Sequence, residues 1–100
     1  MVTTHLDRQF CFLTEWYQPR LKTSELEDLT TALEHSARGM AAEGEPIELL
    51  ITVAAAGDEI LYGVFRSDTA ETVAHTCREA GLPADRISVV HARLTAGRES

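Results

Sequence analysis

Basic side chains are scarce in this chain of 100 residues, which contains a single lysine, Lys22, and no cluster of lysine and arginine. Nine basic residues stand against sixteen acidic ones, so the formal net charge at pH 7 is −7. Nucleic acids and anionic membranes are bound mainly through clustered Lys and Arg side chains. The composition therefore argues against both as partners.

Cysteine is scarce too, and long apolar runs are absent. Cys11 and Cys77 are far apart and fall inside predicted elements, which is not the pattern of a disulfide framework. We expect two reduced thiols that pack as small apolar side chains. Neither a membrane-spanning run nor a signal-peptide segment within Met1–Arg8 is present, so we expect a cytoplasmic protein of bacterial type.

Two strand–helix–strand units follow one another along the chain. The predicted strands are Gln9–Tyr17, Ile47–Ala55, Glu59–Arg66 and Arg86–Leu94, and the predicted helices are Ser24–Ala42 and Thr69–Ala80. The order βαββαβ in one domain predicts an α+β ferredoxin-like sandwich, a four-stranded antiparallel sheet with two helices on one face. Because this fold supports many unrelated functions, it does not by itself indicate an activity.

Apolar residues recur every three or four positions in both predicted helices. The stripes are Leu26, Leu29, Leu33, Ala37 and Met40 in the first helix, and Ala70, Val73, Ala74, Cys77 and Ala80 in the second. Each helix thus has one apolar side for packing on the sheet. Ser24 with Glu27, and Asp68 with Glu71, have the spacing typical of helix starts.

The first predicted strand has apolar side chains at both alternating positions. Phe10, Phe12 and Trp16 are even-numbered, whereas Cys11 and Leu13 are odd-numbered. Since the helices cover one face only, the other face is expected to meet a second copy or to enclose an apolar pocket. We expect a homodimer with the two sheets facing each other. A monomer with a partly apolar sheet is the alternative.

Histidine and glutamate suggest a metal site. The histidines are His5, His35, His75 and His91. His5 is expected to lie in a flexible leader, and His35 is expected to face solvent. Glu71 and Glu79 flank His75 at four residues on each side, so these three side chains project from one helical face. An imidazole and a carboxylate at this spacing can share a divalent cation, although a solvated acidic face is the alternative.

Three residues on predicted strands are candidates for proton transfer. In this fold the last strand, with His91, neighbours the first, with Glu15. If the register brings them together on the open face, the pair can act as general base and acid or as metal ligands. Tyr62 is a possible proton donor. This hypothesis is a cofactor-independent isomerase, cyclase or monooxygenase with a small apolar substrate; an ordinary cross-strand pair is the alternative.

Three segments of the chain have a recognisable pattern. Phe12–Glu15 followed by Pro19 has the form aromatic-x-x-Glu-x-x-x-Pro in the first predicted strand. Ala42–Gly44 ends the first predicted helix, and Ala80–Pro83 followed by Asp85–Ile87 has the form Ala-Gly-Leu-Pro, two residues, Arg-Ile. Together these segments resemble a bacterial family of small ferredoxin-like proteins, mostly without assigned function, that has a nickel-binding branch.

The resemblance implies a dimeric sandwich and, in part of the family, binding of a divalent metal. Arg66 and Val89 stand where many relatives have carboxylates, so this chain lacks two acidic residues of that pattern. The leading hypothesis is a small homodimer that binds nickel or another divalent metal. The alternatives are the small-molecule enzyme and an assembly module without a small-molecule site.

Overall fold

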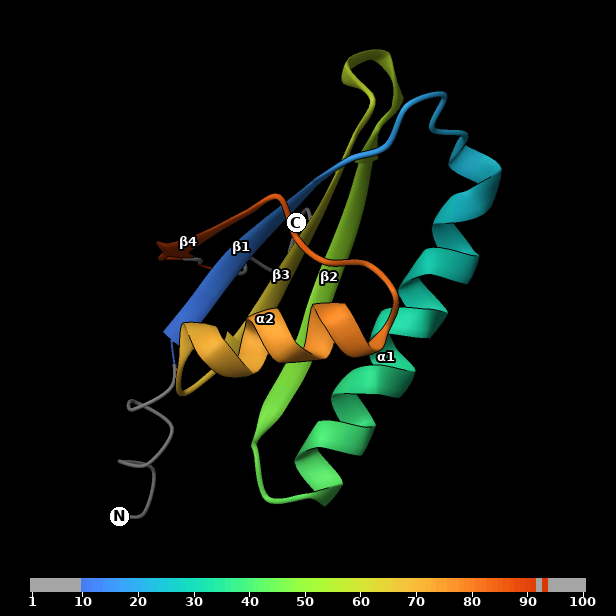
Figure 1. The fold of residues 1–100 in the computed structure, drawn as a ribbon. Coiled ribbons are helices and arrows are strands. Elements are labelled where there is room, and N and C mark those ends of the chain that lie inside the picture. Colours follow the sequence, from blue (N-terminus) through green and yellow to red (C-terminus); the bar gives the residue numbers. More distant parts are fainter. Residues whose placement is uncertain (1–9, 92, 94–100) are drawn as a thin grey trace, which may run out of the picture.

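The computed structural model describes residues 10–91 and 93. The strands are β1 (Phe10–Tyr17), β2 (Ile47–Ala55), β3 (Ile60–Ser67) and β4 (Arg86–Val90), and the helices are α1 (Leu26–Ala42) and α2 (Ala70–Glu79). The strands form one antiparallel sheet in the order β2-β3-β1-β4 (Figure 1). This arrangement confirms the predicted α+β ferredoxin-like sandwich.

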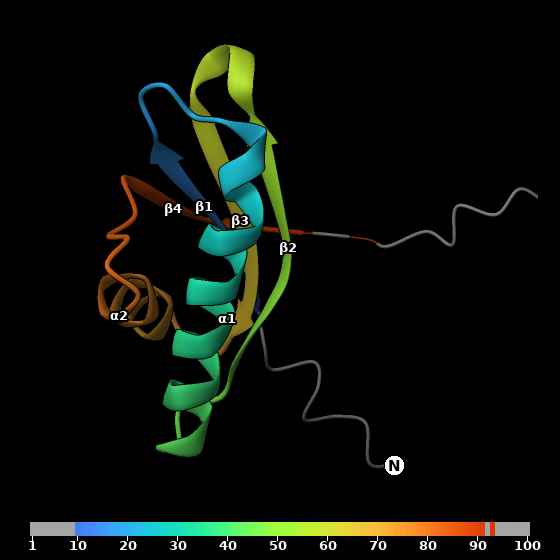
Figure 2. The ribbon, with the colours of Figure 1, turned by 90° about the vertical axis from the view of Figure 1, so that its right-hand side faces the viewer.

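Both helices pack on the same side of the sheet (Figures 1 and 2). Along β1 the even-numbered residues from Phe12 to Trp16 are buried beneath them, and along β3 the odd-numbered residues from Leu61 to Ser67 are buried. The core unites these strand residues with Leu33 of α1 and Val73 of α2. The sheet thus has one face covered by helices and one face free of them, which we call the open face.

The centre of the covered face depends on a glycine. Gly63 of β3 lies opposite Thr14 of β1, whose Oγ1 donates a hydrogen bond to the Gly63 carbonyl oxygen at 2.9 Å. The Trp16 ring lies over Gly63, and its Nε1 donates to the Leu82 carbonyl oxygen at 2.6 Å. The tryptophan therefore fills the space that a side chain at position 63 would need, and it ties β1 to the loop after α2.

Most element boundaries differ from prediction by a residue or two. A 3₁₀ turn over Thr23–Glu25 precedes α1, and Glu25, rather than Glu27, accepts the N–H of Lys22 at 3.4 Å. Helix α2 is capped by Thr69, whose Oγ1 accepts the Thr72 N–H at 3.1 Å, and not by Asp68. The other boundaries agree closely, except at the last strand. It was predicted to reach Leu94 but ends at Val90, so His91 and Arg93 lie outside it. Gln9 and Leu94 lie outside the described residues.

Within residues 10–91 and 93, no helix has the length and apolar character needed to cross a membrane.

Candidate functional site

The open face has an apolar centre that spans all three longer strands. Cross-strand pairing places Leu13 of β1 opposite Val64 of β3, and Val64 opposite Ile51 of β2. Tyr62 of β3 is paired in the same way with Val53 of β2. Ile51 and Val53 have exposed fractions of 54% and 47%. The described chain therefore presents a contiguous apolar patch on this face.

Two ion pairs flank the apolar centre. Arg66 of β3 contacts Glu48 of β2 through its Nη2 atom. Arg86 of β4 places its Nε atom 3.8 Å from Oε2 of Glu15 on β1. The first pair lies on the β2–β3 side of the patch. The second lies on the β1–β4 side, and Glu15 is four residues further along β1 than Cys11, the partner of Arg66. The patch is therefore bordered by a neutral pair of charges at each of two opposite corners.

The register brings two of the three predicted proton-transfer residues together. Glu15 and Tyr62 are direct cross-strand partners on the open face. On its other side Glu15 is paired with Arg86. His91 follows the end of β4 and lies five residues beyond Arg86, about 16 Å of extended chain. The Glu15–His91 pair considered above is therefore not formed, while catalytic roles for Glu15, Tyr62 and His91 stay a prediction.

The cysteines lie on different faces of the sandwich. Cys77 of α2 is fully buried in the core, and burial raises its thiol pKa to about 12. Cys11 lies on the open face, partly buried, opposite Arg66 and Val90. Both are free thiols. Since the two thiols lie on opposite faces of the sheet, they are not placed to form a bridge with each other, and the expectation of core packing holds for Cys77.

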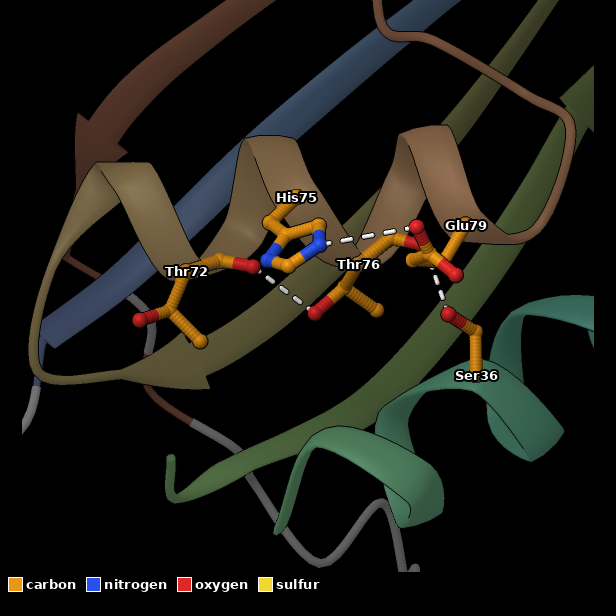
Figure 3. A network of polar contacts seen from close by, with 5 residues as sticks. All are labelled: Ser36, Thr72, His75, Thr76 and Glu79. Atoms are coloured by element: carbon orange, nitrogen blue, oxygen red, sulfur yellow. Dashed lines mark hydrogen bonds and ion pairs between the residues drawn. The ribbon is translucent and has the colours of Figure 1, made fainter. Parts of the chain in front are cut away.

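A groove between α1 and α2 collects the histidines of both helices. It has a volume of about 640 Å³ and is lined by His35 of α1, by Glu43 just after that helix, and by His75 and Glu79 of α2. Nε2 of His75 lies 3.5 Å from Oε2 of Glu79. Figure 3 marks this contact with a dashed line. Beneath them Ser36 of α1 donates a hydrogen bond to a backbone carbonyl of α2, that of Thr76, at 2.7 Å.

The structure brings only two of the three predicted metal ligands together. His75 and Glu79 are in contact, but Glu71 is exposed and does not line the groove. Within residues 10–91 and 93, no three His, Cys, Asp or Glu side chains lie close enough together to hold an ion as they stand. His5 lies outside the described residues.

Sequence reasoning missed the contribution of α1 to the groove. His35 is exposed, as expected, yet it faces the same groove as His75. The available signal was the spacing of small residues on α1, Ala32, Ser36 and Gly39, which leaves open space beside a second helix. It also missed Arg86 as the partner of Glu15, because that pairing depends on strand register.

No family model matches the sequence, and a search of curated proteins finds no match. Among solved structures, the chain is similar to SCO4226 from Streptomyces coelicolor A3(2). The two are 17% identical with a TM-score of 0.66, and the match covers 84% of this chain and 99% of that one. The likeness shows the fold alone. The resemblance to a nickel-binding family stays a prediction.

Proposed function

We propose that the protein acts as a homodimer whose open sheet faces pack against each other. The observation that carries this proposal is the half-exposed apolar patch around Leu13, Ile51, Val53 and Val64. Contiguous apolar surface of this kind typically marks an interaction site. A second copy is the natural partner because it presents an identical apolar surface, and most soluble oligomers are homodimers with two-fold symmetry.

The size of the face sets how much surface a dimer can bury. Four strands about 4.8 Å apart, each about seven residues long, span a plane of roughly 19 by 23 Å, or about 440 Å². Two such planes bury about 900 Å² in projection, and side-chain relief adds to this value. Specific interfaces begin at about 1,000–1,200 Å² in total. We therefore expect a weak, reversible dimer, as is typical of interfaces below about 1,200 Å².

A matched pair of substitutions tests the proposal. Val53 lies on the open face and Val89 on the covered side of β4, opposite Phe12, and both are well exposed in the chain, at 47% and 63%. Burying a valine in an interface is worth about 1.5–3 kcal/mol. Since a two-fold interface contains the residue twice, Val53→Asp should raise the dissociation constant at least about 100-fold. Val89→Asp should leave it unchanged.

The measurement is sedimentation equilibrium over a wide concentration range, with circular dichroism to verify that each variant is folded. A wild-type chain that stays monomeric at millimolar concentration removes the proposal. So does an equal loss of association in both variants, because that result locates the contact elsewhere.

Divalent metal binding is a second candidate, supported by the His75–Glu79 contact and the family resemblance. Imidazole nitrogen and carboxylate oxygen are suitable ligands for nickel and zinc, so the chemistry of the donors fits. With two ligands in contact, most of the coordination shell is left to water or to a rearranged side chain. We therefore expect weak binding through His75 and Glu79.

Calorimetric titration of nickel into chelator-treated protein tests this candidate. Wild type should give heat, His75→Ala should lose it, and His91→Ala, a histidine outside the groove, should keep it. No heat at millimolar nickel would eliminate metal binding. Equal heat from wild type and His75→Ala would place it elsewhere.

A further inference from the structure

The open face has a different ratio of acidic to basic residues from the whole chain. The formal net charge of the chain is −7. Among the strand residues that the structure describes, the charged side chains on this face are Glu15, Glu48, Arg66 and Arg86, two acidic and two basic. The charges of these strand residues therefore sum to zero, and two copies can approach through them without the repulsion that their other acidic surfaces would exert.

Covering the face would also remove the water that now hydrogen-bonds to these charged side chains. Burying an ion pair is favourable only when further hydrogen bonds satisfy its remaining donors and acceptors. A guanidinium has five N–H donors, more than one carboxylate can accept. Arg66 is 42% exposed and its partner Glu48 is 59% exposed, so water now supplies what Glu48 does not. A partner that displaces this water must offer acceptors of its own.

We propose that the charged residues of the open face pair across the dimer interface and make it selective for a second copy of this chain. This inference rests on the proposed homodimer and concerns what fixes its partner. Arg66 of each copy pairs with a carboxylate of the other, Glu48 or Glu15. Because each corner pair contains both signs, the same face can be complementary to itself, as a two-fold interface requires.

Inverting the sign of every charge on the face provides the test. The inverted chain is Glu15→Arg, Glu48→Arg, Arg66→Glu and Arg86→Glu, and it preserves both ion pairs within the chain. Two inverted copies remain complementary, whichever carboxylate Arg66 meets. An inverted copy facing a wild-type copy has like charges at each cross-interface contact. If complementary charges select the partner, wild-type chains should pair with wild-type chains and inverted chains with inverted chains. Dimers of one wild-type and one inverted chain should be rare.

The readout is native mass spectrometry of equimolar mixtures, with differently tagged wild-type chains as the mixing control. The control should contain about half heterodimer, as random exchange requires, and the mixture with the inverted chain less than about a tenth. Free mixing would overturn the inference and leave the dimer intact. A monomeric wild type would instead remove the proposed function. If the inverted chain is unfolded, Glu48→Arg/Arg66→Glu and Glu15→Arg/Arg86→Glu replace it. Each double variant should exclude wild-type chains if Arg66 meets Glu48, or lose its own self-association if Arg66 meets Glu15. Normal self-association together with free mixing by both overturns the inference.

Discussion

A single methyl group at position 63 should destabilise the fold, because the covered face has no room for it. A Cβ atom at Gly63 would lie 3.0 Å from Oγ1 of Thr14 and 3.1 Å from two ring carbons of Trp16. Thr14 is fully buried and Trp16 is 1% exposed, and both are held by hydrogen bonds. Neither neighbour can move aside without losing a contact, so the added methyl overpacks the core.

The expected magnitude follows from two opposing effects. Overpacking a core typically costs about 1–3 kcal/mol. Replacing glycine by alanine lowers the entropy of the unfolded chain, which returns about 0.5–1 kcal/mol. The cost of overpacking is larger than the entropic gain, so Gly63→Ala should reduce the free energy of unfolding by about 1–2 kcal/mol. For a domain of this size, that corresponds to a Tm lower by roughly 5–10 °C.

The assay is urea unfolding followed by far-UV circular dichroism at one fixed protein concentration, since self-association adds to apparent stability. Gly39→Ala is the matched control, because its Cβ meets nothing within 4 Å on an exposed helical surface. It should stabilise the chain by up to about 1 kcal/mol. In a Trp16→Phe background, where the crowding ring carbons are gone, Gly63→Ala should cost less. Equal cost in both backgrounds, or no cost in wild type, would refute the reasoning.

Further predictions concern titration and helix packing. Burial raises the pKa of Cys77 from 9.0 to about 12. The contribution of this raised pKa to folding stability is complete below pH 9 and is lost as the pH rises towards 12. In urea titrations the free energy of unfolding of Cys77→Ala should therefore fall less steeply across that range than that of wild type. The hydrogen bond and charge of Glu59 raise the pKa of Tyr17, so Glu59→Ala should lower it towards 10.0, observed by NMR of the Tyr17 ring. Ser36→Ala removes a buried hydrogen bond between α1 and α2 and should cost about 1 kcal/mol in the same urea assay.

The fold was predictable because local signals agree along the whole chain. The predicted bounds of β2, Ile47–Ala55, are those observed. The apolar stripe of α1 predicted its buried side correctly, since Leu33, Ala37 and Met40 are all in the core. Periodicity identifies which side of an element is buried, and element order then leaves one common sandwich topology.

The candidate site was less predictable because it depends on contacts between elements. Glu15 could meet His91, Arg86 or Tyr62 according to strand register, and a shift of one residue moves every side chain to the other face. The observed register selects Arg86 and Tyr62. Likewise, His35 is exposed on its helix, and only the packing of α1 beside α2 shows that it shares a groove with His75.

Side chains alternate between the two faces of each strand, so neighbouring residues contribute to different properties. One face determines the stability of the fold, and the other determines the association of two copies. Along β3, Leu61 and Phe65 are fully buried beneath the helices, while Tyr62 and Val64 alternate with them on the open face. Polar substitution at Phe65 removes core packing and should unfold the chain, whereas Val64→Asp leaves the helical layer intact and should affect only the dimer. The two substitutions lie on neighbouring residues of one strand. A folded but monomeric Val64→Asp chain would therefore locate the contact on the open face, independently of any change in the core.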